Sequence, residues 1–273
     1  MPPAKAVNAA GIDPYMPPVK AGEGEHYAHA RETDSAHVQL TDPGMGMIHR
    51  EKFLFYRGVG NFSLPVSVKA IGKDWFELKN DGKQPLSWAF VVNVAEDKSV
   101  RFTLLENVTG TVKVTLPSQR STVDHLAGYV QKMLMTDGLY LKEALSMVHT
   151  WQSSWFGEPG TRVLYSLPQT YTDALLPLKL NPAPKQNVRV MVGRLETLTP
   201  EQERRIEGLI GKLGSADPSV REQTDAEIRK LGRFAEPALV RVSKTTSDPE
   251  IKAQAGRLIR EVLVANGVVA SPK

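Results

Sequence analysis

The hydrophobic period of this 273-residue chain changes from that of strands to that of helices, and no other feature constrains the fold as strongly. From about residue 36 to 118, apolar and polar residues alternate, as in strands with one buried face. At "SQRSTVD" the apolar spacing becomes helical and stays so to about residue 156. Strand patterns return in "TRVLYSLP" and "NVRVMVGRLE", and at "LETLTPEQE" the helical spacing resumes. A fold with both β and α parts is therefore required.

The alternating region predicts about six short strands, which at this spacing are typical of an antiparallel sandwich. The predicted strands are "KFLFYR", "SLPVSVKA", "DWFELK", "SWAFVVNV", "VRFTLL" and "TVKVTL". Pro65 indicates an edge strand or a strand start. "NDGK", after "DWFELK", is a hairpin signal. Gly58 and Gly60 in "YRGVGNF" predict a bulge or tight turn, because a phosphate loop needs a third glycine and a following helix.

Two helical regions carry capping signals. We expect a helical hairpin at about 121–156, with Ser121 as N-cap and a break at "TDG". The later region begins with Thr199 as cap, Pro200 at the first helical position and Gln202 completing a capping box. "DPSVREQTDAEIRK" and "DPEIKAQAGRLIRE" then form a weak repeat 31 residues apart, with "GRFAEPALVRV" as the helix between them.

The predicted fold class is α+β: an antiparallel β-sandwich with an inserted helical hairpin, followed by a small all-α, HEAT-like domain. Residues 1–24 are rich in Pro, Gly and Ala and predict a disordered tail. The β-sandwich domain is expected at 25–198 and the helical domain at 199–273.

Composition excludes some classes of function. The net charge of +4 comes from cations interleaved with acids, so we expect no nucleic-acid partner. The absence of cysteine removes disulfides, thiolate chemistry and Cys-ligated metals. No apolar run reaches the roughly 18 residues of a membrane span, and the first twenty residues lack the apolar core of a signal peptide.

Several stretches resemble known sequences. "LGSADPSVREQTDAEIRKLGRFAEPAL" is similar to degenerate HEAT-like segments of exported bacterial proteins. "ARETDSAHV", "EKFLFYRGVGNFSLPV" and the run from "GLYLKEALSMVHTW" to "RLETLTPEQE" resemble an uncharacterised exported family of planctomycete and myxobacterial type. The resemblance implies a periplasmic or extracellular location, with the cytoplasm as the alternative, and brings no catalytic residues. Whether the chain is complete at its N-terminus stays open.

The stretch "HYAHARETDSAH" holds three histidines, His26, His29 and His37, that are candidate metal ligands. Glu25, Glu32 and Asp34 could add oxygen ligands. A metal site needs preorganised ligands and supporting contacts, and this stretch follows a disordered-looking tail without a helical stripe. We therefore interpret it as a solvated approach to the first strand and expect no metal and no cofactor.

The window "HTWQSSWFGEPGTRVLY" is the richest in chemistry. Trp151 and Trp155 lie four residues apart on one helical face, which favours packing. The alternative is an aromatic platform for a glycan or protein; its candidate binding residues are Trp151, Trp155, Phe156 and Arg162.

Known catalytic motifs are absent from the sequence, which favours a non-enzymatic binding or scaffold protein of the bacterial envelope. Its helical repeats, and an aromatic patch, would dock a protein or glycan. The alternative is a hydrolase of an envelope polymer, with carboxylates assembled near Trp151 and Trp155. Its candidate catalytic residues are His149, Glu158 and Asp173.

Overall fold

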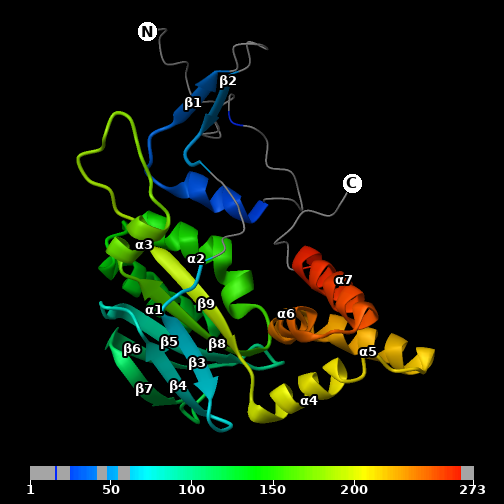
Figure 1. Ribbon diagram of the computed structural model, residues 1–273. Coiled ribbons are helices and arrows are strands. Elements are labelled where there is room, and N and C mark those ends of the chain that lie inside the picture. Colours follow the sequence, from blue (N-terminus) through cyan, green and yellow to red (C-terminus); the bar gives the residue numbers. More distant parts are fainter. Residues whose placement is uncertain (1–15, 17–24, 42–47, 55–61, 266–273) are drawn as a thin grey trace.

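The structure is a computed structural model that describes residues 16, 25–41, 48–54 and 62–265. It contains antiparallel sheets, a pair of helices packed on one of them, and a group of C-terminal helices (Figure 1). The chain is therefore mixed α and β, as the changes of period predict. The expected tail, 1–24, lies outside the described residues apart from Met16.

The central element is a four-stranded sheet in the order β6-β5-β8-β9 with every neighbouring pair antiparallel. Its strands are β5 (Leu86–Val94), β6 (Val100–Val108), β8 (Gly160–Leu167) and β9 (Met191–Thr197). A three-stranded sheet has the order β3-β4-β7, from β3 (Val66–Ala70), β4 (Trp75–Asn80) and β7 (Gly110–Thr115). A small hairpin joins β1 (Val38–Thr41) to β2 (Ile48–Glu51).

Strand β5 is buried on both faces, because successive side chains of a strand point to opposite sides. Ala89 and Val91 belong to a core that also contains Phe76 of the three-stranded sheet. Phe90 and Val92 belong to a second core, formed with the two helices on the other face. The four-stranded sheet is therefore the middle of three layers.

The two helices of the outer layer are α1 (Val123–Thr136) and α2 (Leu141–Phe156). They lie where the helical hairpin is predicted, and α2 carries the short 3₁₀ helix η1 (Glu25–Glu32) against it (Figure 1). Helix α3 (Gln169–Leu175) follows β8. The N-cap of α1 is Thr122, whose side chain accepts from the amide of His125, whereas the predicted cap, Ser121, forms a backbone bridge with Val100.

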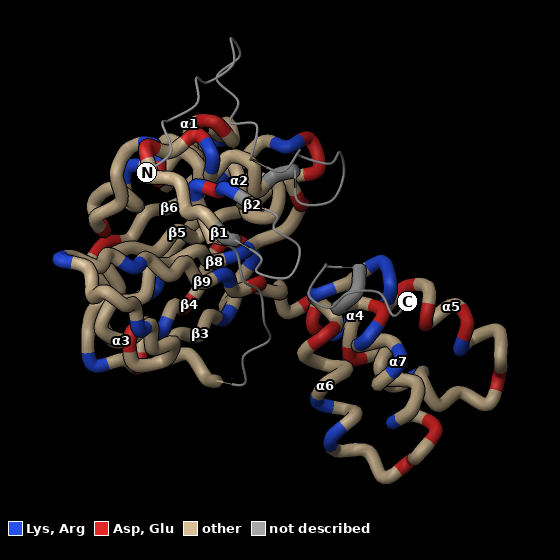
Figure 2. Tube along the Cα trace, turned by 90° about the horizontal axis from the view of Figure 1, so that it is seen from above, with Lys and Arg blue, Asp and Glu red and all other residues tan. Residues whose placement is uncertain are grey.

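The C-terminal helices form a separate body beside the sheets, with Lys and Arg interspersed with Asp and Glu over both parts (Figure 2). They are α4 (Pro200–Ile210), α5 (Pro218–Leu231), η2 (Gly232–Phe234), α6 (Glu236–Thr245) and α7 (Pro249–Ala265). Their core includes Leu213, Ile228, Leu239 and Leu258, which are almost completely buried. Thr199 and Gln202 form the predicted capping box.

The hairpin predicted at "NDGK" is wrong, and the strand predicted at "KFLFYR" lies partly outside the described residues. "NDGK" does not close a hairpin, because β4 pairs with β3 and β7 while β5 pairs with β6 and β8. Instead the Asn80 side chain accepts from the Gly82 amide and donates to the carbonyls of Gln84 and Val108, and the chain passes to the other sheet. In "KFLFYR", residues 52–54 follow β2 without being a strand, and 55–57 lie outside the described residues, as do Gly58 and Gly60. No helix in the described part is both long and apolar enough to cross a bilayer.

Candidate functional site

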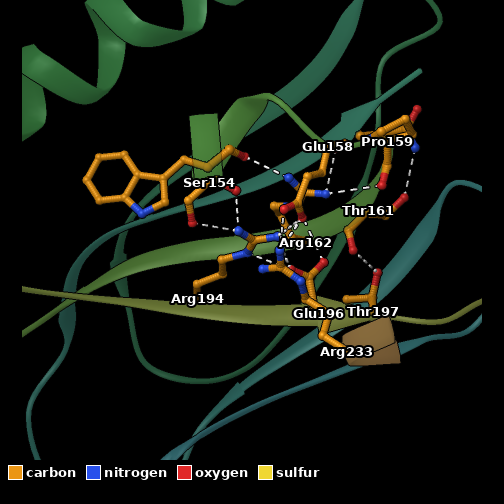
Figure 3. A network of polar contacts seen from close by, with 11 residues as sticks. Ser154, Glu158, Pro159, Thr161, Arg162, Arg194, Glu196, Thr197 and Arg233 are labelled. Carbon is orange, nitrogen blue, oxygen red and sulfur yellow. Dashed lines mark hydrogen bonds and ion pairs between the residues drawn. The ribbon is translucent and has the colours of Figure 1, made fainter. Parts of the chain in front are cut away.

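Five charged side chains gather where the C-terminal helices meet the sheets (Figure 3). We call Glu158, Arg162, Arg194, Glu196 and Arg233 the arginine–glutamate cluster. Arg162 and Glu196 are cross-strand neighbours on β8 and β9, with Nε of Arg162 3.4 Å from Oε2 of Glu196. Glu158 precedes β8, and Arg233 comes from η2.

Arg162 is completely buried and is held by backbone carbonyls at the end of α2. It donates to the carbonyl oxygens of Trp155 at 2.9 Å, Glu158 at 2.8 Å and Pro159 at 3.3 Å. The last carbonyls of a helix lack partners within the helix, and the negative end of its dipole favours a cation. The guanidinium thus completes the C-terminus of α2 and fixes it to the sheet.

Burial lowers the pKa of Arg162 to about 10, against the opposing effect of Glu196. The side chain therefore remains charged at neutral pH. Arg194 supports the same helix end, because it donates to the carbonyl and, at 2.9 Å, to the hydroxyl of Ser154, and it pairs with Glu158 at 3.1 Å.

Arg233 connects this cluster to the C-terminal helices. Its guanidinium forms ion pairs with Glu158 and, at 3.7 Å, with Glu196. The neighbouring ring of Phe234 covers Gly160, where an added Cβ would lie 2.9 Å from the ring and φ is +126°. A glycine is needed at this position for both reasons. Because Arg162 is buried and Arg194 and Glu196 nearly so, we interpret the cluster as a structural clasp between the two bodies.

The candidate catalytic residues have separate partners. His149 lies beside His29 and Glu32, with Nδ1 3.9 Å from Oε2 of Glu32. Glu158 belongs to the arginine–glutamate cluster. Asp173, on α3, pairs with Arg189 at 2.9 Å, at the opposite end of β8 from Glu158. Eight residues of strand span about 26 Å, far more than the roughly 5–10 Å between the carboxyls of a glycosidase.

Three of the four candidate binding residues are buried, and the fourth is accessible. Trp155, Phe156 and Arg162 are 5%, 1% and 0% exposed, so they are core residues and do not form a surface for a partner. This corrects their interpretation as binding residues; the burial favours the packing alternative. Trp151 alone is accessible, at 36%, and its ring meets that of Tyr27 edge-on at 6.1 Å between centroids.

Some of the candidate metal ligands lie together in the structure and others do not. His29 and Glu32 come together with His149, and their possible ligand atoms all lie within 4.8 Å of one another. His37 is exposed and is not part of this group. The side chain of His26 lies outside the described part of the structure. The sequence pattern does not indicate this group, and His149 is a catalytic candidate there, because this third member lies 117 residues beyond Glu32.

A hollow of about 580 Å³ that was not predicted lies at one end of the two larger sheets. Trp75, on β4, is 54% exposed at this hollow. The polar and charged side chains that line it are Lys73, Asp74, Asn93, Ser99, Arg101, Thr115, Ser118 and Arg120. Alternation along "DWFELK" could have found the indole, since Phe76 and Leu78 point to the core and Trp75 must then point outward.

Hydrogen bonds fix the polar wall of this hollow. Arg101 donates to Asp74 at 2.7 Å and to Asn93 at 3.3 Å, and the bond from Arg101 lowers the pKa of Asp74. Arg120 donates to Ser99 at 2.9 Å. The wall is thus preorganised: of the three cations that line it, Arg101 pairs with Asp74 at 2.7 Å and Arg120 pairs with Asp97 at 2.6 Å.

Comparisons with known proteins give no relationship: no family model matches the chain, and no curated protein or solved structure matches it.

Proposed function

We propose that this protein is a non-enzymatic binding and scaffold protein of the bacterial envelope, and that it binds an anionic glycan in the hollow at Trp75. The observation that carries the proposal is a half-exposed indole beside a preorganised polar wall. A sugar ring has an apolar face of C–H groups and a polar rim of hydroxyls. An indole covers such a face while amide, hydroxyl and guanidinium groups bind the rim.

The charges of the hollow favour an acidic polymer. Lys73, Arg101 and Arg120 line it, and two acids, Asp74 and Asp97, pair with the two arginines, which leaves the cations in excess by one. Guanidinium groups bind carboxylates and phosphates with directional hydrogen bonds. Peptidoglycan carries carboxylates on its sugars and peptides, and this chemistry fits both the hollow and an envelope location. The location itself rests on the resemblance of the quoted segments to exported bacterial proteins.

The scaffold part of the proposal rests on the C-terminal helices. In this interpretation the two larger sheets are a β-sandwich and the helices a HEAT-like unit, clasped together through Arg233 and Glu158. A groove of about 610 Å³ between α5 and α7, lined by Arg221, Asp225 and Arg257, would offer a second, protein-binding surface. Buried Asp225 fixes that groove by accepting from Gln254 at 2.7 Å and pairing with Arg257.

The hydrolase alternative is not proposed, because His149, Glu158 and Asp173 belong to three different sets of contacts.

Titration calorimetry with soluble peptidoglycan fragments tests the glycan proposal. We expect binding by the intact chain, weaker by about tenfold or more (about 1.4 kcal/mol) in Trp75→Ala. Arg101→Gln should weaken binding of these fragments but not of a neutral glucan. Trp151→Ala is the matched control, because that indole is also accessible but does not line the hollow. Equal binding by Trp75→Ala and the intact chain, or no binding by either, would contradict the proposal.

A further inference from the structure

We propose that His29, Glu32 and His149 bind one divalent transition-metal ion of the zinc type, and that this ion fastens the N-terminal segment to helix α2. The site is independent of the glycan hollow.

The ligand atoms are already close to the spacing that such an ion needs. Nδ1 of His29 lies 2.9 Å from Oε1 of Glu32, and Nδ1 of His149 lies 3.9 Å from Oε2 of the same carboxylate. The two imidazole rings are 5.0 Å apart between centroids, at 61°. Around tetrahedral zinc, with bonds of about 2.0–2.1 Å, ligand atoms lie about 3.3–3.5 Å apart. Side-chain rotations that move each atom by about an ångström or less are enough to close the group around an ion, since no pair is more than 4.8 Å apart.

Backbone structure explains why these side chains meet. A 3₁₀ helix has about three residues per turn, so His29 and Glu32 of η1 lie directly above one another. The hydroxyl of Ser146 donates to the carbonyl of His29 at 2.6 Å, which sets η1 against α2. His149 is three residues after Ser146 and therefore lies on the same face of α2, next to that contact.

The donor set selects the class of ion. Two imidazoles and one carboxylate suit Zn²⁺ and its neighbours Fe²⁺, Co²⁺, Ni²⁺ and Cu²⁺, whereas Ca²⁺ and Mg²⁺ prefer oxygen ligands only. Three protein ligands leave a position for water. The side chains are 36%, 59% and 41% exposed, so an ion can enter from solvent.

A metal ion at this position would stabilise the packing of the N-terminal segment on α2, which apolar contacts support only weakly. Between residues 27 and 39 only Thr33 is buried, so the segment gains little from apolar burial. Its ties to α2 include polar and surface contacts: the bond to Ser146, the ion pair of Asp34 with Lys142, and the ring contact of Tyr27 with Trp151. An ion that binds only the docked arrangement shifts the equilibrium toward it.

The test is titration of the full chain, without a histidine tag, with Zn²⁺ alone, together with the visible absorption of Co²⁺ as a report on ligand number and type. We expect one ion per chain, and at least tenfold weaker binding in Glu32→Gln and in His149→Ala. Glu32 is exposed, so its substitution does not threaten the fold. His37→Ala is the matched control, because this histidine belongs to the same stretch but lies outside the group.

Limited trypsin digestion gives a second readout. Zn²⁺ should slow cleavage after Arg31 in the intact chain and in His37→Ala, but not in Glu32→Gln or His149→Ala. Absence of Zn²⁺ binding by the intact chain, unchanged binding in both ligand variants, or equal loss in His37→Ala would overturn the proposed site. Trp75→Ala should bind Zn²⁺ normally, which keeps this result distinguishable from a failure of the glycan proposal.

Discussion

Replacing Arg162 by methionine tests whether the arginine–glutamate cluster stabilises the protein. Methionine keeps an unbranched apolar stem but removes the guanidinium and leaves the carbonyls of Trp155, Glu158 and Pro159 without this donor. Hydrogen bonds to a charged group contribute about 1.5–3 kcal/mol each. Against that, burial lowers the pKa of Arg162 to about 10 although Glu196 opposes the shift, which indicates a net cost of about 3 kcal/mol for holding the charge in these surroundings.

The balance predicts that Arg162→Met lowers the free energy of unfolding by about 2–5 kcal/mol, which overlaps the range of about 3–5 kcal/mol for breaking a buried ion pair. Urea titration at 25 °C, followed by tryptophan fluorescence and far-ultraviolet circular dichroism, measures it. Arg205→Met is the matched control: Arg205 is 64% exposed and pairs with Glu227 at the surface, so its loss should cost less than about 1 kcal/mol. Equal unfolding midpoints for the two variants would refute the reasoning, since the helix end would then be satisfied without Arg162.

Four further predictions concern Tyr165, its neighbour Gly193 and a helix cap. Burial raises the pKa of Tyr165 to about 12, above the unfolded value of 10.0, so the folded chain keeps this proton longer. The contribution of protonated Tyr165 to the free energy of unfolding is complete below about pH 10 and is lost as the pH rises through about 12. In Tyr165→Phe this pH-dependent loss of stability should be absent, as measured by unfolding titrations across the same range. The same variant should be about 1 kcal/mol more stable at pH 7, because the buried hydroxyl has no hydrogen-bond partner in the described structure; a less stable variant would reveal one. Gly193→Ala should cost about 2 kcal/mol or more in thermal unfolding, since an added Cβ would lie 2.2 Å from the Tyr165 ring; an unchanged midpoint would show that the ring can move. Asp248→Ala should cost about 0.5–2 kcal/mol, because Asp248 accepts from the amides of Glu250 and Ile251, whereas Asp248→Asn, which caps equally well, should be nearly neutral.

Local physics explains which parts of the fold were predictable from sequence. The start of α4 depends on Thr199, Pro200 and Gln202, which act within one turn, and all three lie where the capping pattern predicts. The outward direction of Trp75 follows from alternation alone. Local sequence does not distinguish Ser121 from Thr122 as the N-cap of α1, because the pairing of Ser121 with Val100 depends on a strand about twenty residues earlier.

Strand pairing, the burial of Arg162 and the meeting of His29 with His149 could not be predicted, because each depends on residues far away in the sequence. "NDGK" has the composition of a hairpin turn, yet the partners of β4 and β5 are chosen by which sheet buries Phe76 and which buries Phe90. Arg162 is an ordinary strand cation in the sequence, and only the end of α2 gives it enough acceptors to be buried. His29 and His149 meet because η1 packs on α2, which neither stretch indicates alone.

The order β6-β5-β8-β9 also has a consequence for how the chain acquires its shape. Strands β5 and β6 can pair as soon as both exist, but Val94 meets Gly160 only after 65 intervening residues have been made. Loops of that length close slowly unless their own contacts form first, and the helical pair α1 and α2 lies inside this one. We therefore expect α1 and α2 to associate early during synthesis and to carry β8 back to its place beside β5. Until then one edge of β5, with the apolar run from Ala89 to Val92, stays open to other chains, and this is the interval in which the nascent protein is most prone to aggregate.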